Sequence, residues 1–135
     1  MNCTAGIRRV GDVAIVDLRG RFTLSDAPGR IRDTVASALE SGARNILLNL
    51  AEVTLMDSAA GIGELVISYT RALRQGGRLK LLNANKHISR VLQITRLDTI
   101  FEMYENEDAA VGSFQALSQD PVSEPPIPWR KLKSA

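Results

Sequence analysis

The stretch Asn45-Ile46-Leu47-Leu48-Asn49-Leu50 decides the fold that this sequence predicts. Its apolar residues are nearly continuous, whereas a strand with one face in water alternates between apolar and polar residues. Such a run is typical of a strand in the middle of a sheet, covered on both faces. We therefore expect an α/β domain with residues 46–50 as its central strand.

A β-hairpin is predicted before this central strand. Two apolar runs, residues 7–10 and 13–18, are joined by Gly11-Asp12, which suits a two-residue turn because such turns need positive φ. A loop follows over residues 20–29, and Pro28 suits the first position of a helix. The hairpin predicts that the first two strands are antiparallel.

Helices and strands alternate through the rest of the domain. Apolar residues recur at helical spacing over residues 31–39, 62–73, 88–94 and 110–117, and the other predicted strands are residues 78–82 and 101–104. In the third helix we expect Ile88, Val91, Leu92 and Ile94 to point inward. This order predicts an α/β fold with a mixed sheet of about five strands and about four α-helices. Ligand and partner contacts gather beyond the carboxyl ends of parallel strands, where the predicted loop 51–57 and the following helix start lie.

Length and composition indicate one globular domain with a tail. The chain has 135 residues, of which 44% are hydrophobic and 24% charged. We expect the domain to span residues 1–118. Residues 119–135 contain four prolines and a basic end, which predicts a flexible, Pro-rich tail.

Charge and hydropathy exclude several classes of partner. A net charge of +2 and 4% aromatic residues argue against direct nucleic-acid binding. The longest apolar runs are too short for membrane insertion, and the start of the chain lacks the apolar core of a signal peptide, so we expect a cytoplasmic protein. Cys3, the lone cysteine, cannot form an internal disulfide, and its place near the chain end predicts an incidental role.

The motifs of common enzymes are incomplete. Residues 61–66 begin like a dinucleotide-binding fingerprint, but Val66 stands where the third glycine belongs. Ser58 follows a strand as a hydrolase nucleophile would, yet Met56 replaces the glycine of the nucleophile elbow, and His87 is the only histidine. One Cys and one His cannot build a typical metal site. We therefore expect no enzymatic activity, no metal and no cofactor.

The most informative segment lies at the start of the second predicted helix. Asp57 or Ser58 can cap this helix by accepting a hydrogen bond from a free backbone N–H. The small residues that follow leave its first turn bare, which also suits a flat docking surface with a hydroxyl at its centre. Phosphorylation there would add a charge of about −1.5 to −2. The two interpretations are compatible, because a cap can also be a switch.

These residues resemble the STAS domain, specifically the bacterial anti-sigma factor antagonists. The resemblance covers about residues 7–117, and its motifs are Asn45–Leu50, Met56-Asp57-Ser58 and Gly61-Ile62-Gly63. It implies a regulator of transcription that acts by partner switching. Unphosphorylated, such a protein binds an anti-sigma factor, a serine kinase, and so releases the sigma factor. The kinase ends this interaction by phosphorylating the residue that matches Ser58, and a serine phosphatase resets it.

The resemblance also implies which residues contact the partner. They are Thr23, Asp57, Ser58, Ala59, Ala60, Gly61, Ile62 and Gly63. Two positions depart from the family's pattern. Ala59-Ala60 puts two residues between the serine and Gly61 where the family has one, so we expect an altered turn or a shifted helix start. Thr23 stands where many switching antagonists carry an aspartate. The alternative is a STAS scaffold or sensor subunit of a signalling assembly or transporter, with Ser58 only a cap.

Overall fold

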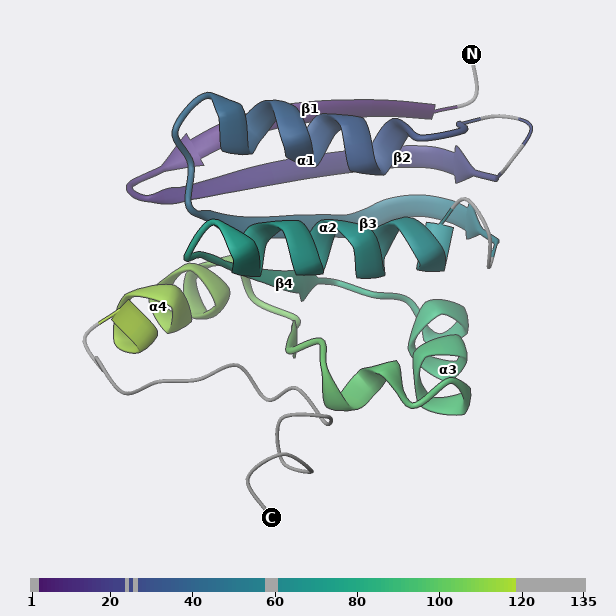
Figure 1. Ribbon diagram of the computed structural model, residues 1–135. Helices are drawn as coiled ribbons and strands as arrows, with labels where there is room; N and C mark the ends of the chain where they lie inside the picture. Colours follow the sequence, from purple (N-terminus) through teal and green to yellow (C-terminus); the bar gives the residue numbers. More distant parts are fainter. Residues whose placement is uncertain (1–2, 24, 26, 58–60, 119–135) are drawn as a thin grey trace.

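A five-stranded mixed sheet forms the middle of the protein (Figure 1). The computed structural model describes residues 3–23, 25, 27–57 and 61–118. The strands are β1 (Cys3–Val10), β2 (Val13–Phe22), β3 (Asn45–Met56), β4 (Arg78–Leu82) and β5 (Met103–Tyr104). They lie in the order β1-β2-β3-β4-β5, with β1 antiparallel to β2 and every other pair parallel. The predicted fold class and the central place of residues 46–50 are confirmed.

Strand β3 is longer than predicted. Residues 51–56, expected in a loop, continue the strand beside β2 as far as the pair Phe22–Met56. Two register shifts between β2 and β3 break the alternation of apolar and polar residues in this half of the strand. The longer strand carries the chain to Asp57 at the carboxyl edge of the sheet.

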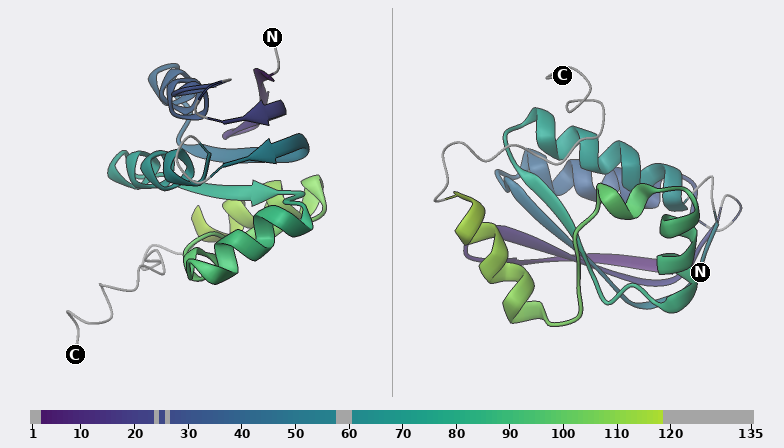
Figure 2. Two further views of the ribbon diagram at one scale, coloured as in Figure 1. Left: turned by 90° about the vertical axis from the view of Figure 1, so that its right-hand side faces the viewer. Right: turned by 90° about the horizontal axis from the view of Figure 1, so that it is seen from below.

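Helices cover the two faces of the sheet unequally (Figure 2). The helices are α1 (Arg30–Glu40), α2 (Gly63–Arg74), α3 (Lys86–Ile94) and α4 (Glu107–Ser118), with a 3₁₀ turn at Leu97–Thr99. Helices α1 and α2 lie side by side on one face, and α4 lies on the other. No helix within the described ranges is long and apolar enough to cross a bilayer.

The larger core fills the space between the sheet and helices α1 and α2. It includes Ile31, Val35, Ala38 and Leu39 of α1, as predicted. Cys3 also belongs to it, because β1 begins at this residue and its side chain is buried. The expectation of an incidental cysteine was therefore wrong.

Two further predictions about the helices were wrong. Helix α1 begins at Arg30, two residues after Pro28, because Gly29 turns the chain with a φ of 75°. Ile94 is 74% exposed, whereas Ile88 and Leu92 are buried. Ile94 is the last residue of α3, where the chain leaves the helix, so the inward periodicity does not extend to it.

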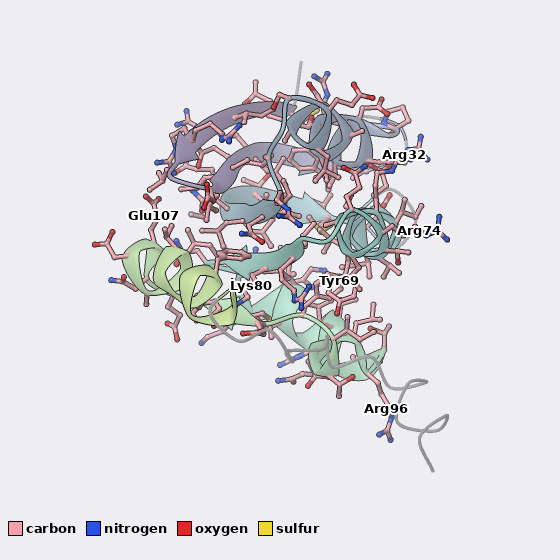
Figure 3. All side chains as sticks on the ribbon, turned by 60° about the vertical axis from the view of Figure 1, so that its left-hand side comes forward. Arg32, Tyr69, Arg74, Lys80, Arg96 and Glu107 are labelled. Carbon is pink, nitrogen blue, oxygen red and sulfur yellow. The ribbon has the colours of Figure 1, made fainter. Side chains whose placement is uncertain are left out.

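Helix α4 is held on the second face by a buried cation. Lys80 of β4, only 2% exposed, donates to the Ser113 hydroxyl at 2.8 Å and lies 4.7 Å from the centre of the Phe114 ring. Figure 3 shows Lys80 between the sheet and α4. Burial lowers the pKa of Lys80, while Glu102 beside it acts in the opposite direction. The contacts of the Lys80 ammonium group with Ser113 and Phe114 offset part of the free-energy cost of burying its charge.

A second polar contact joins the two ends of the domain. Arg8 of β1 donates to Asp17 from Nε at 2.6 Å and to Glu107 of α4 from Nη2 at 2.8 Å. Asn49 also donates to Asp17 at 2.8 Å. The hydrogen bonds from Arg8, and to a smaller extent that from Asn49, hold the pKa of Asp17 below its ordinary value. The bonds to Asp17 and Glu107 raise the pKa of Arg8. One network thus connects β1, β2, β3 and α4.

Replacing Asp17 by asparagine should reduce the acid sensitivity of the fold. Because Asp17 binds its proton less readily in the folded chain, its contribution is full at neutral pH and is lost as the pH falls through its folded-state pKa, below 3.8. We expect Asp17→Asn to lower the free energy of unfolding by about 1 kcal/mol at pH 7 and by less near pH 2. Urea unfolding at both pH values measures this difference, with Asp12→Asn in the exposed hairpin turn as the control. An equal loss at both pH values would contradict the prediction.

Candidate partner-docking site

The carboxyl ends of β2 and β3 meet at one edge of the sheet. The Asp57 N–H donates to the Phe22 carbonyl at 3.2 Å, just beyond the last residue pair of the two strands. Thr23 follows Phe22 directly and is 9% exposed. Its carbonyl accepts from the Ala27 N–H at 2.9 Å, which turns the chain toward α1. The structure therefore places Thr23 and Asp57, predicted from segments far apart in the sequence, side by side.

A wide turn connects β3 to α2. The Asp57 carbonyl accepts from the Gly61 N–H at 3.2 Å and from the Ile62 N–H at 3.1 Å. The second of these bonds spans five residues, one more than an α-helical turn, and is typical of a π-turn. A π-turn contains one residue more than an α-helical turn. The expectation that Ala59-Ala60 alters the turn concerns residues outside the described part of the chain and stays a prediction.

The α-helical part of α2 begins at Gly63, and Ile62 before it makes no side-chain cap hydrogen bond. Ile62 already has helical backbone angles, and the helical hydrogen bonds start at the Asp57 carbonyl, which is the position of a cap. Side-chain capping by Asp57 or Ser58 stays a prediction, because residues 58–60 lie outside the described part of the chain. Gly61 is needed at this point, because a Cβ at Gly61 would lie 1.9 Å from Cγ of the buried Met56. The helix start thus packs closely against the end of β3.

The predicted contact residues fall into two groups. Thr23, Asp57, Gly61, Ile62 and Gly63 lie in the described part of the chain and surround the carboxyl ends of β2 and β3. Ser58, Ala59 and Ala60 lie outside the described residues. The positions on either side of these three, Asp57 and Gly61, are joined by the hydrogen bond of the turn. The segment that contains Ser58 is therefore bounded at both ends by fixed backbone.

Glu64 is a residue of this region that the sequence did not reveal. It lies in the first turn of α2 and is 6% exposed. Its carboxylate accepts from the Gly29 N–H at 2.7 Å and from the Arg32 N–H at 3.1 Å. The small residues Ser68 and Ala72 share its helix face and are buried, but they do not indicate what the Glu64 carboxylate binds.

The described residues also place the side chains that could serve in catalysis or metal binding. His87 is exposed at the start of α3, where the Asn85 side chain accepts from the Ile88 N–H and caps the helix. In the described ranges no group of His, Cys, Asp and Glu side chains could hold a metal ion. Tyr69 has its pKa raised by burial in the core, where it packs against Phe101. The described part of the site offers backbone and small side chains, which suit contact with another protein.

Comparisons with known proteins agree with this geometry. Residues 5–110 match the family model of the STAS domain. The anti-sigma-B factor antagonist of Bacillus subtilis (strain 168) is 28% identical over 111 residues, which cover 82% of this chain and 99% of that protein. The chain belongs to the STAS domain family, and the predicted family is confirmed.

Solved structures share the fold. An anti-sigma factor antagonist from Mycobacterium paratuberculosis has a TM-score of 0.72 at 18% identity, over 84% of this chain and 94% of that one. The unphosphorylated form of the anti-sigma factor antagonist SpoIIAA has a TM-score of 0.71 at 23% identity, over 84% of this chain and 97% of that one. SpoIIAA of Bacillus has also been solved phosphorylated, with a TM-score of 0.65 at 22% identity, over 82% of this chain and 98% of that one.

Proposed function

We propose that this chain is an anti-sigma factor antagonist that regulates transcription by partner switching. The observation that carries the proposal is the convergence of Thr23, Asp57 and the glycine-rich turn 61–63 at one edge of the sheet. The likeness to the anti-sigma-B factor antagonist extends over nearly the whole of that relative and supports the same role. The partner that we assign to this surface is an anti-sigma factor.

The switch that we propose is the phosphorylation of Ser58 by the anti-sigma factor, acting as a serine kinase, and its reversal by a serine phosphatase. Ser58 follows Asp57, whose backbone is fixed by bonds to Phe22, Gly61 and Ile62. A phosphoryl group at this point would add a charge of about −1.5 to −2 to the docking surface of this chain. The partner is complementary to that surface in its unmodified form. Displacement of the partner then follows from the cost of burying that charge.

The elements that border the proposed contact surface are anchored on the hydrophobic core. Buried Ile62 and Leu65 anchor the first turns of α2 on the core, and Met56 anchors the end of β3. Gly63, which is partly exposed, carries no side chain that would cover the backbone, whereas Gly61 is buried against Met56. A partner can therefore approach the backbone closely at Gly63, without having to order a long side chain there.

The first test is release of a sigma factor in a purified system. We expect the unphosphorylated chain to bind an anti-sigma factor from its own organism and to free the sigma factor held by it. Native mass spectrometry of the mixture detects both complexes. The same mixture with ATP should place phosphate on Ser58 and restore the anti-sigma–sigma complex, and a serine phosphatase should reverse this effect.

The competing function is a scaffold or sensor subunit without a phosphorylation switch. It predicts a stable assembly with signalling or transport components whose composition is the same with and without ATP. Failure to release any sigma factor, together with such an assembly, would overturn the proposed function.

A further inference from the structure

The feature behind this inference is a cap that one helix supplies to another. Glu64 belongs to α2, yet both of its hydrogen bonds go to backbone N–H groups at the start of α1, those of Gly29 and Arg32. Figure 3 shows Arg32 on the edge of α1 next to α2. We propose that Glu64 is a positioning residue that fixes the start of α1, from Ala27 to Arg32, as the second half of the partner-docking surface.

Helix α1 lacks a cap of its own. Its N-cap residue is Gly29, which makes no side-chain cap hydrogen bond and has a φ of 75°. This left-handed conformation favours glycine, so the residue that fits the backbone has no side chain with which to accept. The first N–H groups of a helix carry partial positive charge and need acceptors when they are buried. The Glu64 carboxylate meets both needs, with two oxygens for two N–H groups.

The cap also joins the two segments that follow the parallel strands. One segment leaves β2 at Phe22 and is closed by the Thr23–Ala27 hydrogen bond before it reaches Gly29. The other leaves β3 at Asp57 and reaches Glu64 through the π-turn. The Asp57–Phe22 bond ties the two segments where they begin, and Glu64 ties them again where their helices begin. Two ties fix the relative position of the segments more firmly than one.

The burial of Glu64 gives these bonds their strength. At 6% exposure the carboxylate is shielded from water, so its two charge-assisted bonds have little competition from solvent. Neither bond depends on an exposed side chain, since both donors are main-chain groups. A partner that contacts the surface therefore meets a preformed arrangement at Gly29 and Arg32 and does not have to order the start of α1.

The test compares Glu64→Gln with a control that destabilises α1 elsewhere. Glutamine keeps the length of the side chain but replaces one acceptor oxygen by an NH₂ group, so one of the two bonds is lost. Val35→Ala is the matched control, because Val35 is fully buried in α1 and does not contact Glu64 through a hydrogen bond. Hydrogen exchange reports on the Gly29 and Arg32 amides, and calorimetry measures affinity for the anti-sigma factor.

We expect Glu64→Gln to increase the exchange rates of the Gly29 and Arg32 amides, while the variant stays folded. Its affinity for the anti-sigma factor should fall about tenfold. Val35→Ala should keep the affinity within about twofold. Glu64→Asp, too short to reach both amides, should behave like Glu64→Gln and replaces it if glutamine prevents folding. Unchanged affinity with faster exchange would overturn the proposal, as would equal losses of affinity in Glu64→Gln and Val35→Ala.

This inference rests on the proposed function, but the two can fail separately. If the wild-type chain binds no anti-sigma factor, the proposed function fails. Unchanged exchange at Gly29 and Arg32 in both Glu64 variants would show that Glu64 does not position this segment, whatever the partner.

Discussion

Replacing Ser58 by aspartate should weaken binding of the anti-sigma factor at least about tenfold, or about 1.4 kcal/mol, while the domain stays folded. The carboxylate brings a negative charge into a surface that matches an uncharged hydroxyl, and the charge must be desolvated or repelled when the partner docks. Phosphorylated wild type should bind more weakly still, because a phosphoryl group carries about twice that charge. Calorimetry with the purified anti-sigma factor measures all three affinities.

Two variants separate this effect from a general effect of charge. Ser58→Ala removes the acceptor hydroxyl without adding charge, so it should bind within about twofold of wild type and take up no phosphate at this position. Ser37→Asp adds the same charge on the exposed side of α1, about two turns from the start of the helix, and should leave the affinity unchanged. Phosphate on another residue, or equal affinities for Ser58→Ala, Ser58→Asp and the phosphorylated chain, would reduce Ser58 to a structural residue.

Replacing Gly77 by alanine should destabilise the domain by about 3 kcal/mol or more. A Cβ at this position would lie 1.5 Å from the Arg44 carbonyl oxygen and 2.5 Å from its carbon. These are main-chain atoms just before β3, and Arg78, the next residue, already pairs with Asn45. The clash can therefore be relieved only by moving the start of β3 or β4. Urea unfolding followed by circular dichroism measures the loss.

Gly112 provides the matched control for Gly77. It lies exposed within α4, where a new Cβ would meet no atom within 4 Å. Gly112→Ala should therefore stabilise the protein by about 0.5–1 kcal/mol, since alanine favours the helix and removes freedom from the unfolded chain. If Gly77→Ala unfolds at the same urea concentration as wild type, the close approach of Gly77 to Arg44 is wrong.

Local sequence patterns predicted the elements that are regular. Strand β4 was predicted with its observed bounds, Arg78–Leu82, because a β-type run directly follows two glycines. The second half of β3 was missed, because the register shifts opposite β2 remove the alternation by which a strand is recognised. Those shifts depend on the neighbouring strand, which a local pattern does not contain.

One part of the candidate site was predictable from the sequence and another was not. Parallel strands end at one edge of a sheet, so the meeting of Thr23 with Asp57 follows from topology. The role of Glu64 does not, because its partners are main-chain N–H groups 35 and 32 residues away. Every residue except proline has such a group, and nothing in the sequence marks which of them will need an acceptor.

The contact between Arg8 and Glu107 bears on the order in which the chain assembles during synthesis. The two residues lie 99 positions apart, near the beginning and the end of the domain. When α4 leaves the ribosome, β1, β2 and β3 have already been made, so Arg8 and the apolar face around Ile15 and Leu47 can be in place to receive it. The last helix then completes the domain by docking on a finished surface, and a chain interrupted before Glu107 keeps that surface open to other proteins.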